Sequence, residues 1–383
     1  HQVTVLCEFP NHPHGILPER YRGRWLEQEE MNGFTVRRSW VFATPRKTFG
    51  RRLLFYLSFM ISSFLAGLTA PGRYDVVYAT SPPFFVGFSG WLLSLIKRAR
   101  FVFEVRDLWP DSAVALGMLR HPLLIALSCW LEHFYYRRAV RVVVVTRGIY
   151  QHLLAEGVPE WRLLLIPNGS SPEHFRPMSA TAIRQRLRIA DKFVVGYAGV
   201  FGLAQGMEHL CQLARLMRGE RGIHFLLVGD APKRRQVLEM QADWRLNNLT
   251  VHPAVSHEEI PEMLCAFDLC LVPLRRNELF LGAMPSKMFD AMACARPILL
   301  SVAGEAQAVL EAAEAGVAVP PEDLTAMRQT ILRLRDDPAA CRRMGENGRR
   351  LVEAEYARDQ LAARIEQCLV SMIGPESPPG PTP

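Results

Sequence analysis

Strand-like apolar runs alternate with helix-length segments along almost the whole chain, and this alternation constrains the fold more than any other feature. In the first half the runs are VTVL, DVVYAT, RFVFEV, RVVVVT and LLLIP, and in the second they are FVVGYAG, HFLLVGD, LTVHP, LCLVP, PILLS and VAVP. Amphipathic stretches between the later runs cover 207–219, 232–243, 256–266 and 322–335. Alternating β and α units favour parallel sheets covered by helices on both faces, so we predict an α/β fold.

Turn-forming residues interrupt the alternation between 168 and 192, and 383 residues are enough for two domains. We therefore predict two doubly wound Rossmann-like domains, over 1–172 and 173–352. A helix over 353–371 is expected to pack back across to the first domain. The tail over 372–383 contains ESPPGPTP and is expected to be disordered.

The eight cysteines form no C-x-x-C pair and no zinc-binding spacing with histidine. Scattered cysteines of this kind fit a reducing compartment, so we predict a cytoplasmic protein. Residue 1 is histidine rather than methionine, and a strand-like run follows at once. We therefore expect the chain to begin inside a larger gene product.

Basic residues are concentrated in the first half of the chain. Through Met178, 21 Lys and Arg stand against 13 Asp and Glu, whereas the remainder has 24 against 25. A one-sided basic half suggests an anionic partner, which is a membrane surface, a nucleic acid or a phosphate. The basic residues lack interleaved aromatic residues and match no recognition motif, so we do not expect a nucleic-acid partner.

Two apolar stretches in that basic half, 53–72 and 84–96, leave two interpretations open. Both are core helices of the first domain, or one or both also expose an apolar face to a bilayer. In the second case the basic pairs at 51–52 and 97–98 would meet anionic headgroups. A membrane-spanning helix is disfavoured, because strand-like runs flank the region on both sides.

Two strand-like runs in the second half end in glycines that indicate phosphate binding. In GYAGVFGLAQGMEHL, Gly199, Gly202 and Gly206 occupy a strand-to-helix turn, where backbone amides can approach an anion. The spacing is not G-x-G-x-x-G, and a plain turn is the alternative. In FLLVGDAPKRR, Gly229 ends a strand and Lys233 precedes a helix. A cation is unfavourable there unless it meets an anion or lies in solvent.

The segment AMPSKMFDAMACARPILLS over 283–301 is more informative. Ser286 or Lys287 is expected in the first turn of a helix, where backbone amides point outward. Lys287 is costly at that place unless it meets a phosphate, and Asp290 can accept hydrogen bonds from a ribose diol. A helix cap explains Ser286 by itself, but it does not explain the whole Ser-Lys-x-x-Asp group.

The run RFVFEV ends in a burst of charge, FEVRDLWPDS over 103–112. One interpretation is a salt-bridged cluster that only ties the loop. The other is a site in which Glu104, Arg106, Asp107 and Asp111 project from a strand end.

Taken in order, these segments resemble the family-4 retaining glycosyltransferases, which have two Rossmann-like domains of the GT-B type. The resemblance rests on GYAGVFGLAQGMEHL, FLLVGDAP, PSKMFDAMACARPIL and GEAQAVLEAAEAGVAVPPED. The segments EFPNHPHG, YDVVYATSPPFFVG and FEVRDLWPDSAVALGML are similar to the colanic-acid and O-antigen branch of L-fucosamine and related sugar transferases. The resemblance to the family covers about residues 1–370.

The resemblance implies two domains that face each other across a cleft. The second would hold a nucleotide sugar, usually UDP-linked, and the transferred sugar in this branch is an N-acetylated amino sugar such as FucNAc. The first would hold the acceptor, a glycan or a polyprenyl-diphosphate-linked sugar, at the inner face of the cytoplasmic membrane. The reaction would retain the anomeric configuration without a metal or other cofactor. The family's first strand is absent before His1, so we expect the first domain to miss a central strand.

The resemblance also implies roles for single residues. Asp107 would bind a hydroxyl of the donor sugar or the acceptor, with Glu104 or Asp111 in support. Arg106 stands where many relatives have histidine, and because it stays protonated it would stabilise charge rather than act as a base. Gln205 stands in the place of a family lysine and Gly282 in that of a glutamate.

With those two family residues replaced, diphosphate contact should fall more on Lys287, with Lys233 as a second candidate. The expected donor site comprises Gly199, Gly202, Gln205, Gly206, Gly229, Lys233, Ser286, Lys287 and Asp290. Asn11, His14 and Pro83 are candidates for the acceptor side, with a surface turn as the alternative for each.

Three functions compete at this point. A membrane-associated glycosyltransferase explains the apolar runs and the basic half. A nucleotide-sugar epimerase of the same architecture would need no lipid-facing surface. A non-catalytic nucleotide-sugar-binding protein would fit the missing glutamate.

Overall fold

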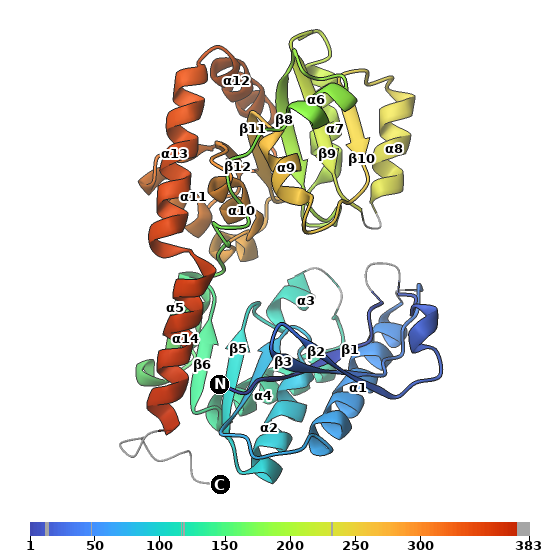
Figure 1. The fold of residues 1–383 in the computed structure, drawn as a ribbon, viewed down its shortest axis with the longest axis vertical. Coiled ribbons are helices and arrows are strands. Elements are labelled where there is room, and N and C mark those ends of the chain that lie inside the picture. Colours follow the sequence, from blue (N-terminus) through green and yellow to red (C-terminus); the bar gives the residue numbers. More distant parts are fainter. Residues whose placement is uncertain (12–14, 47, 116, 118, 231–232, 374–383) are drawn as a thin grey trace. The chain divides into compact units, whose positions relative to one another are not determined.

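The computed structural model describes residues 1–383 except 12–14, 47, 116, 118, 231–232 and 374–383 (Figure 1). The chain divides into two compact units, each with its own parallel sheet. Unit 1 comprises His1–Ile166 and Ile365–Pro383, and unit 2 comprises Pro167–Arg364. This is the two-domain α/β architecture of the GT-B type that the sequence predicts.

Unit 2 contains a six-stranded sheet in the order β10-β9-β8-β11-β12-β13, and all of its pairings are parallel. Its strands are β8 (Phe193–Ala198), β9 (Ile223–Val228), β10 (Leu249–His252), β11 (Leu269–Pro273), β12 (Ile298–Ser301) and β13 (Gly316–Ala318). Every strand predicted in the second half is therefore present. The strand order reverses between β8 and β11, and ligands of such sheets bind outside the carboxyl ends of the strands at this point.

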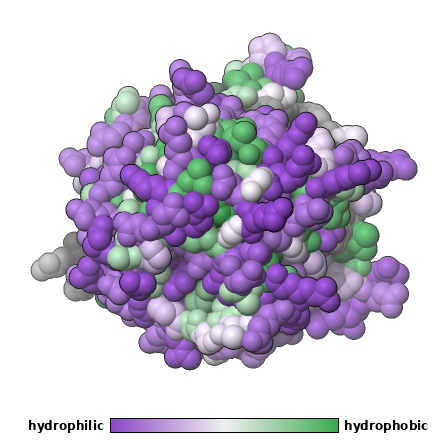
Figure 2. All heavy atoms as spheres, turned by 90° about the horizontal axis from the view of Figure 1, so that it is seen from above, coloured by the Kyte–Doolittle hydropathy of each residue, from purple (hydrophilic) through white to green (hydrophobic). Residues whose placement is uncertain are grey.

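Helices cover both faces of the unit 2 sheet and form a separate hydrophobic core on each face. They are α6 (Thr181–Arg186), α7 (Met207–Leu216), α8 (Arg234–Asp243), α9 (Ile260–Cys265), α10 (Lys287–Ala293), α11 (Glu305–Ala312), α12 (Leu324–Arg335) and α13 (Pro338–Glu355). Small residues let α10 pack closely, because a Cβ at Gly348 of α13 would lie 2.9 Å from Met292. The face in Figure 2 is largely hydrophilic, with apolar side chains in scattered patches.

Unit 1 contains a four-stranded parallel sheet in the order β4-β5-β6-β7. Its strands are β4 (Val76–Ser81), β5 (Arg100–Val105), β6 (Arg141–Val144) and β7 (Leu163–Leu165). The helices of this unit are α1 (Phe49–Leu68), α2 (Val86–Lys97), α3 (Asp111–Ala115), α4 (Pro122–Arg138), α5 (Arg147–Ala155) and the later part of α14 (Arg358–Ile373). Tyr135 of α4 packs in the core against Phe84 and Phe103. Met372 of α14 is fully buried, so the ordered helix extends into the segment predicted to be a disordered tail.

A second sheet of unit 1 was missed by the sequence reasoning. It has the order β1-β3-β2, with β1 (Thr4–Glu8), β2 (Leu26–Met31) and β3 (Phe34–Ser39). The antiparallel hairpin β2–β3 turns at Asn32-Gly33, where both residues have positive φ angles, 50° and 84°. Asn-Gly between two strands is a strong hairpin signal that the sequence does contain. In the described part of the chain β1 pairs only with β3 and β4 only with β5, so the unit has two separate sheets.

The two apolar stretches form α1 and α2, and both helices are half-buried. Within the described residues, Gly50–Leu68 is long and apolar enough to cross a membrane by length and composition, with 28% of it buried. Phe59 and Ala66 face the core, whereas Leu54, Ile61 and Leu65 are exposed. A pure core helix is therefore the wrong description of α1, because one complete apolar face is open.

Candidate functional site

The two predicted glycine turns lie on one side of the reversal of strand order in unit 2, at the carboxyl ends of β8 and β9. Gly199 follows β8 and Gly229 follows β9, and the turns touch, since a Cβ at Gly229 would lie 1.9 Å from the Gly199 carbonyl oxygen. The Phe201 amide donates to the Asp230 carbonyl over 3.0 Å, and the Lys233 amide donates to the Phe201 carbonyl over 3.2 Å. Residues predicted from two separate motifs are thereby brought to one edge of the sheet.

Lys287, the first residue of α10, points at the Gly199 turn. Its Nζ atom donates to the hydroxyl of Tyr197 over 2.7 Å and lies 4.0 Å from the centre of that ring. A Cβ at Gly199 would come within 2.8 Å of Nζ, so glycine is what lets the ammonium group reach the turn. Part of the Lys287 side chain reaches the surface, but burial of the ammonium group lowers its pKa to about 7.

No carboxylate pairs with Lys287 among the described residues, because its only polar contact is the neutral Tyr197 hydroxyl. Tyr197 is fully buried, and its hydroxyl donates to the Val200 carbonyl over 2.7 Å. A buried cation without an acidic partner is unfavourable, and a bound anion would remove that cost. This arrangement therefore fits a phosphate group held by Lys287 beside the backbone of the turn.

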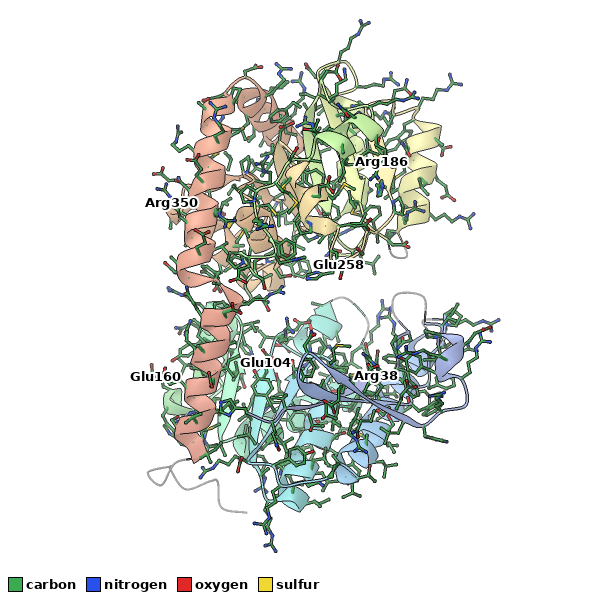
Figure 3. All side chains as sticks on the ribbon, in the orientation of Figure 1. Arg38, Glu104, Glu160, Arg186, Glu258 and Arg350 are labelled. Atoms are coloured by element: carbon green, nitrogen blue, oxygen red, sulfur yellow. The ribbon has the colours of Figure 1, made fainter. Side chains whose placement is uncertain are left out.

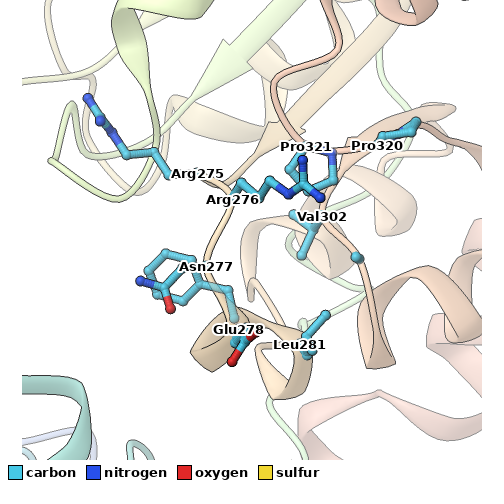
Figure 4. A pocket seen from close by; sticks show the side chains of 10 residues that line it. Arg275, Arg276, Asn277, Glu278, Leu281, Val302, Pro320 and Pro321 are labelled. Atoms are coloured by element: carbon cyan, nitrogen blue, oxygen red, sulfur yellow. The ribbon is translucent and has the colours of Figure 1, made fainter. Parts of the chain in front are cut away.

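A pocket of roughly 350 Å³ opens next to the same turn in unit 2 (Figure 4). It lies beyond the carboxyl ends of β11, β12 and β13, and loop 275–281 forms one wall. Val302, Ala303, Pro320 and Pro321 form the other wall. The Arg275 amide donates to the Ala204 carbonyl over 2.8 Å, and the Arg275 guanidinium pairs with Glu208 at the start of α7. The pocket and the glycine turn therefore share Arg275 as a common wall.

The charged run at the end of β5 lies at the carboxyl edge of the unit 1 sheet. The Arg106 amide donates to the Ser81 carbonyl at the end of β4 over 3.0 Å. The Trp109 ring stacks on Phe84, which follows Pro83, with 5.3 Å between ring centres. The structure thus brings Pro83, Arg106 and Asp107 to one edge.

Asp107 is exposed, yet the atoms around it remove enough water to raise its pKa. The Leu108 amide donates a hydrogen bond that lowers the pKa, and the Ser112 hydroxyl lies near enough to lower it without full hydrogen-bond geometry. No ion pair of Asp107 occurs among the described residues, so the carboxylate can accept hydrogen bonds from sugar hydroxyls.

Comparison with known proteins shows which family the chain resembles. Residues 1–169 match the family described as "Glycosyl transferase 4-like domain", and residues 192–337 match "Glycosyl transferases group 1". The chain belongs to the two-domain glycosyltransferases. Both halves of the glycosyltransferase carry their own match, and each match coincides with one sheet-bearing unit.

Individual relatives agree with this assignment. WcaI of Escherichia coli strain K12, a glycosyl transferase named for colanic acid biosynthesis, is 26% identical over 302 residues, which are 76% of this chain and 73% of WcaI. The structure of sucrose-phosphate synthase from Thermosynechococcus elongatus has a TM-score of 0.72 at 23% identity and covers 97% of this chain and 89% of its own. Anabaena HepE in complex with UDP has a TM-score of 0.68 at 16% identity and covers 96% and 99%. At these identities the two structures show the shared fold.

Within the glycosyltransferase, the other predicted donor residues have surroundings that differ from those of Lys287. Gln205 folds over the turn, because a Cβ at Gly202 would lie 2.5 Å from its Oε1 atom. Gly206 has a positive φ of 57° and precedes α7. The Lys233 Nζ atom donates to Gln236 over 2.8 Å. Ser286 is exposed and makes no side-chain cap, so the expected helix cap is wrong.

Asp290 has a partner of its own, away from Lys287. The fully buried Ser170 donates to its Oδ1 atom over 2.7 Å, and burial raises the pKa of Asp290. The Ser170 amide donates to the Tyr356 carbonyl, and the Ser170 carbonyl accepts from the Arg358 amide. These two backbone hydrogen bonds fasten segment 167–171 to the chain just after α13. A ribose contact of Asp290 stays a prediction and would fall on Oδ2.

Glu104 and Asn11 also have local partners. Glu104 lies on β5 (Figure 3), beside the Tyr78 phenol, whose pKa is raised by burial and by that carboxylate. Asn11 donates to Glu8 over 2.8 Å and to the Phe9 carbonyl over 3.0 Å, so its side chain closes the turn after β1. His14 lies outside the described residues. The roles of all three residues in substrate binding stay predictions.

Two residues of interest were missed by the sequence reasoning. Tyr197 was read only as part of an apolar strand, although a tyrosine in a buried strand end is a polar signal. Glu132 lies in the middle of α4 and receives the Tyr136 hydroxyl over 2.5 Å. Burial raises the pKa of Glu132 to about 7, with Asp111 and Glu156 adding to the effect. No local motif marks a glutamate of this kind, since its surroundings come from three helices.

Among the described residues, no three His, Cys, Asp or Glu side chains gather closely enough to hold a metal ion. The polar groups around Lys287 are a hydroxyl and backbone groups, which suit an anion better than a cation.

Proposed function

We propose that the chain is a retaining glycosyltransferase that moves a hexose-type sugar from a UDP-linked donor to a lipid-linked or glycan acceptor in cell-surface polysaccharide synthesis. The observation that carries the proposal is Lys287, a buried ammonium group at the Gly199 turn that has no acidic partner among the described residues. Its position at the reversal of strand order is where such sheets bind nucleotides.

The chemistry of the leaving group explains this arrangement. Transfer separates the sugar from a nucleoside diphosphate, and negative charge develops on the departing oxygen. Lys287 and the amides of the turn can stabilise that charge by position, so the proposed mechanism requires no metal. The sugar passes through an oxocarbenium-like state, as in glycoside hydrolysis.

The pocket beside the turn is our proposed place for the transferred sugar. It shares Arg275 with the turn, has an apolar floor at Val302, and carries polar groups at Asn277 and Glu278. An apolar floor with a few polar groups is typical of a small-molecule site, and it would suit the methyl groups of an N-acetylated amino sugar such as FucNAc.

Further observations support the proposed nucleotide, acceptor and location. HepE, whose fold is shared, was solved with UDP, and WcaI is named for a polysaccharide. The open apolar face of α1 and the basic first half favour a lipid-linked acceptor. We place the enzyme in the cytoplasm, peripherally at the inner face of the cytoplasmic membrane.

The test is UDP release from UDP-sugars, with and without a lipid-linked acceptor, measured beside UDP binding by calorimetry. We expect binding without acceptor and release only when the acceptor is present. Binding with no release for any donor and acceptor pair would favour a non-catalytic protein, because Gly282 stands where relatives have an acid. Conversion of the donor sugar without release of UDP would favour an epimerase.

An added bulk in the pocket tests the sugar's place. Ala303→Trp should leave the affinity for UDP unchanged and raise the KM for the UDP-sugar strongly, since only the sugar would meet the new side chain. An equal loss of affinity for UDP and for the UDP-sugar would place the nucleotide, not the sugar, in the pocket.

A further inference from the structure

The two edges of the four-stranded sheet in unit 1 differ in charge. Each strand is preceded by basic residues, and because the strands are parallel these residues share the amino edge. The segments before the strands, 71–75, 97–100, 137–141 and 159–162, contain Arg73, Lys97, Arg98, Arg100, Arg137, Arg138, Arg141 and Arg162. Against these eight cations stand two carboxylates in the same segments, Asp75 and Glu160.

The carboxyl edge of the same sheet is balanced. In segments 82–85, 106–111 and 145–148, which follow β4, β5 and β6, Arg106 and Arg147 stand against Asp107 and Asp111. The surplus positive charge of the first half therefore lies mainly at the amino edge, away from the candidate residues.

Several of the amino-edge cations have no acidic partner. Within the described part of the chain, Arg73, Arg98 and Arg137 form no ion pair. The guanidinium groups of Arg141 and Arg162 lie over the Trp161 ring, 5.5 and 4.8 Å from its centre. The Trp161 side chain is still 53% exposed. Like charges gathered without partners repel one another, so an external anionic surface would stabilise this edge.

Exposed aliphatic side chains accompany these cations. Leu68 ends α1, and Leu95 and Ile96 precede Lys97 at the end of α2; they are 40%, 55% and 49% exposed. The Lys97 Nζ atom donates to the Ala70 carbonyl over 2.7 Å, which holds the ends of the two helices together. Aliphatic groups, an exposed tryptophan and unpaired arginines therefore occupy one edge.

We propose that the amino edge of the β4–β7 sheet docks on an anionic lipid surface. The proposal rests on the membrane partner in the proposed function and names the part of the molecule that makes the contact. Arginine and lysine attract anionic headgroups, tryptophan prefers the membrane interface, and Leu68, Leu95 and Ile96 can enter the acyl boundary. A nucleic acid would use the cations, but it offers much less apolar surface to the aliphatic groups than acyl chains do.

The docking edge includes only one of the two basic pairs that the sequence analysis assigns to anionic headgroups. Arg51 and Arg52 begin α1, whereas Lys97 contacts the residue just past its end, so the pairs are separated by the length of the helix. A 20-residue α-helix is about 30 Å long. The pair at 51–52 therefore lies outside the docking edge.

Docking through this edge also restricts the acceptor. Asp107 follows the carboxyl end of β5, and six residues of strand span about 20 Å. The acceptor hydroxyl must then stand away from the headgroups by about that length. A lipid-linked glycan of several sugars fits this geometry better than a single sugar next to its lipid.

The experiment is flotation of the full chain with phosphatidylcholine vesicles, with and without phosphatidylglycerol. Arg137→Glu/Arg138→Glu should lower partitioning onto the anionic vesicles by about tenfold or more, since each surface charge contributes about 1 kcal/mol. Arg51→Glu/Arg52→Glu and Arg342→Glu/Arg343→Glu, the latter an exposed pair on α13, make the same change in net charge and should have little effect. Trp161→Ala should weaken binding with an unchanged dependence on salt.

Unchanged flotation of the 137/138 variant, or an equal loss in the 51/52 variant, would overturn the proposal. Binding of a polynucleotide by this edge in preference to vesicles would overturn it as well. UDP release with a detergent-solubilised acceptor separates the two proposals. The 137/138 variant should retain that activity, whereas a protein that floats normally but never releases UDP would refute the proposed function alone.

Discussion

The carboxyl edges of the two sheets are built for different ligands. In unit 1 the edge presents charged side chains on a loop, among them Arg106 and the exposed Asp107. In unit 2 the edge presents two glycine turns in direct contact and one buried lysine. Both edges come from parallel βα units, so the fold alone does not explain the difference.

The contrast indicates a division of work. Backbone amides and a buried ammonium group suit a fixed anion, which the diphosphate of a donor would supply. An exposed carboxylate without an ion pair suits hydroxyl groups, which both sugars carry. Changes in the two edges should therefore have separable effects on transfer and on nucleotide binding.

The largest expected effect is on the unit 1 edge. Asp107→Asn should lower the rate of transfer by roughly 10²-fold or more, in the range of a positioned proton acceptor, while UDP affinity stays unchanged. Asp75→Asn, at the opposite edge of the same sheet, is the matched control and should transfer normally. Near-normal turnover of the Asp107 variant would show that this carboxylate only organises its loop.

The second largest effect is expected at the carboxyl edge of the unit 2 sheet. Lys287→Ala should weaken UDP binding by roughly 10- to 100-fold, because a charge-assisted hydrogen bond is worth about 1.5–3 kcal/mol. Lys192→Ala removes an equal charge just before β8, at the opposite end of that strand, and should cost much less. Calorimetry with UDP measures the affinity of both variants. Equal losses of affinity would mean that each lysine acts only through the net positive charge of the protein.

The same lysine predicts a dependence on pH. Its pKa in the free protein is about 7, so it is largely neutral above that pH, and a bound diphosphate would raise the pKa again. UDP binding at pH 8 should therefore take up a proton and weaken from pH 6 to pH 8.5. Calorimetry in buffers of different ionisation enthalpy detects this uptake, and Lys287→Met should abolish it.

A stability effect should distinguish the two ends of β9. Gly229→Ala brings a Cβ against the Gly199 carbonyl at a positive φ of 158° and should cost on the order of 2 kcal/mol. For a unit of this size that is a fall of roughly 4–8 °C in Tm. Gly222→Ala, at the other end of β9 with open space around it, should be nearly neutral. Equal Tm values for the two variants would contradict close contact between the turns.

The smallest expected effect concerns Glu132. Its folded pKa, about 7, is raised above the ordinary value of 4.5, so its contribution to stability is present below pH 4.5 and is lost as the pH rises through 7. Glu132→Gln should match the wild type at pH 4 and be more stable than the wild type at pH 8. The shift of about 2.5 pKa units sets an upper bound of about 3.4 kcal/mol on this gain, and solvent screening of the partly exposed carboxylate reduces it. Thermal unfolding across this pH range is the measurement, and a constant difference would refute the shift.

Local pattern was enough to predict most of the strands. All eleven predicted strands are present. Buried parallel strands consist of short apolar runs, which can be recognised without knowing the rest of the sequence. The β2–β3 hairpin was missed because its strands, LEQEEM and FTVRRS, are polar. Tyr197 and Glu132 were missed for another reason, since their importance lies in what faces them.

The sequence by itself determined the α/β architecture, the glycine turns and the Ser-Lys-x-x-Asp helix, because each depends on residues close together in the chain. Only the tertiary structure decided that Lys287 meets Tyr197 and Gly199, that Asp290 instead meets Ser170, and that the surplus cations share one edge. Those three results depend on which strands lie next to each other. Burial of an ammonium group, or repulsion among arginines, exists only after residues from distant segments have been brought together.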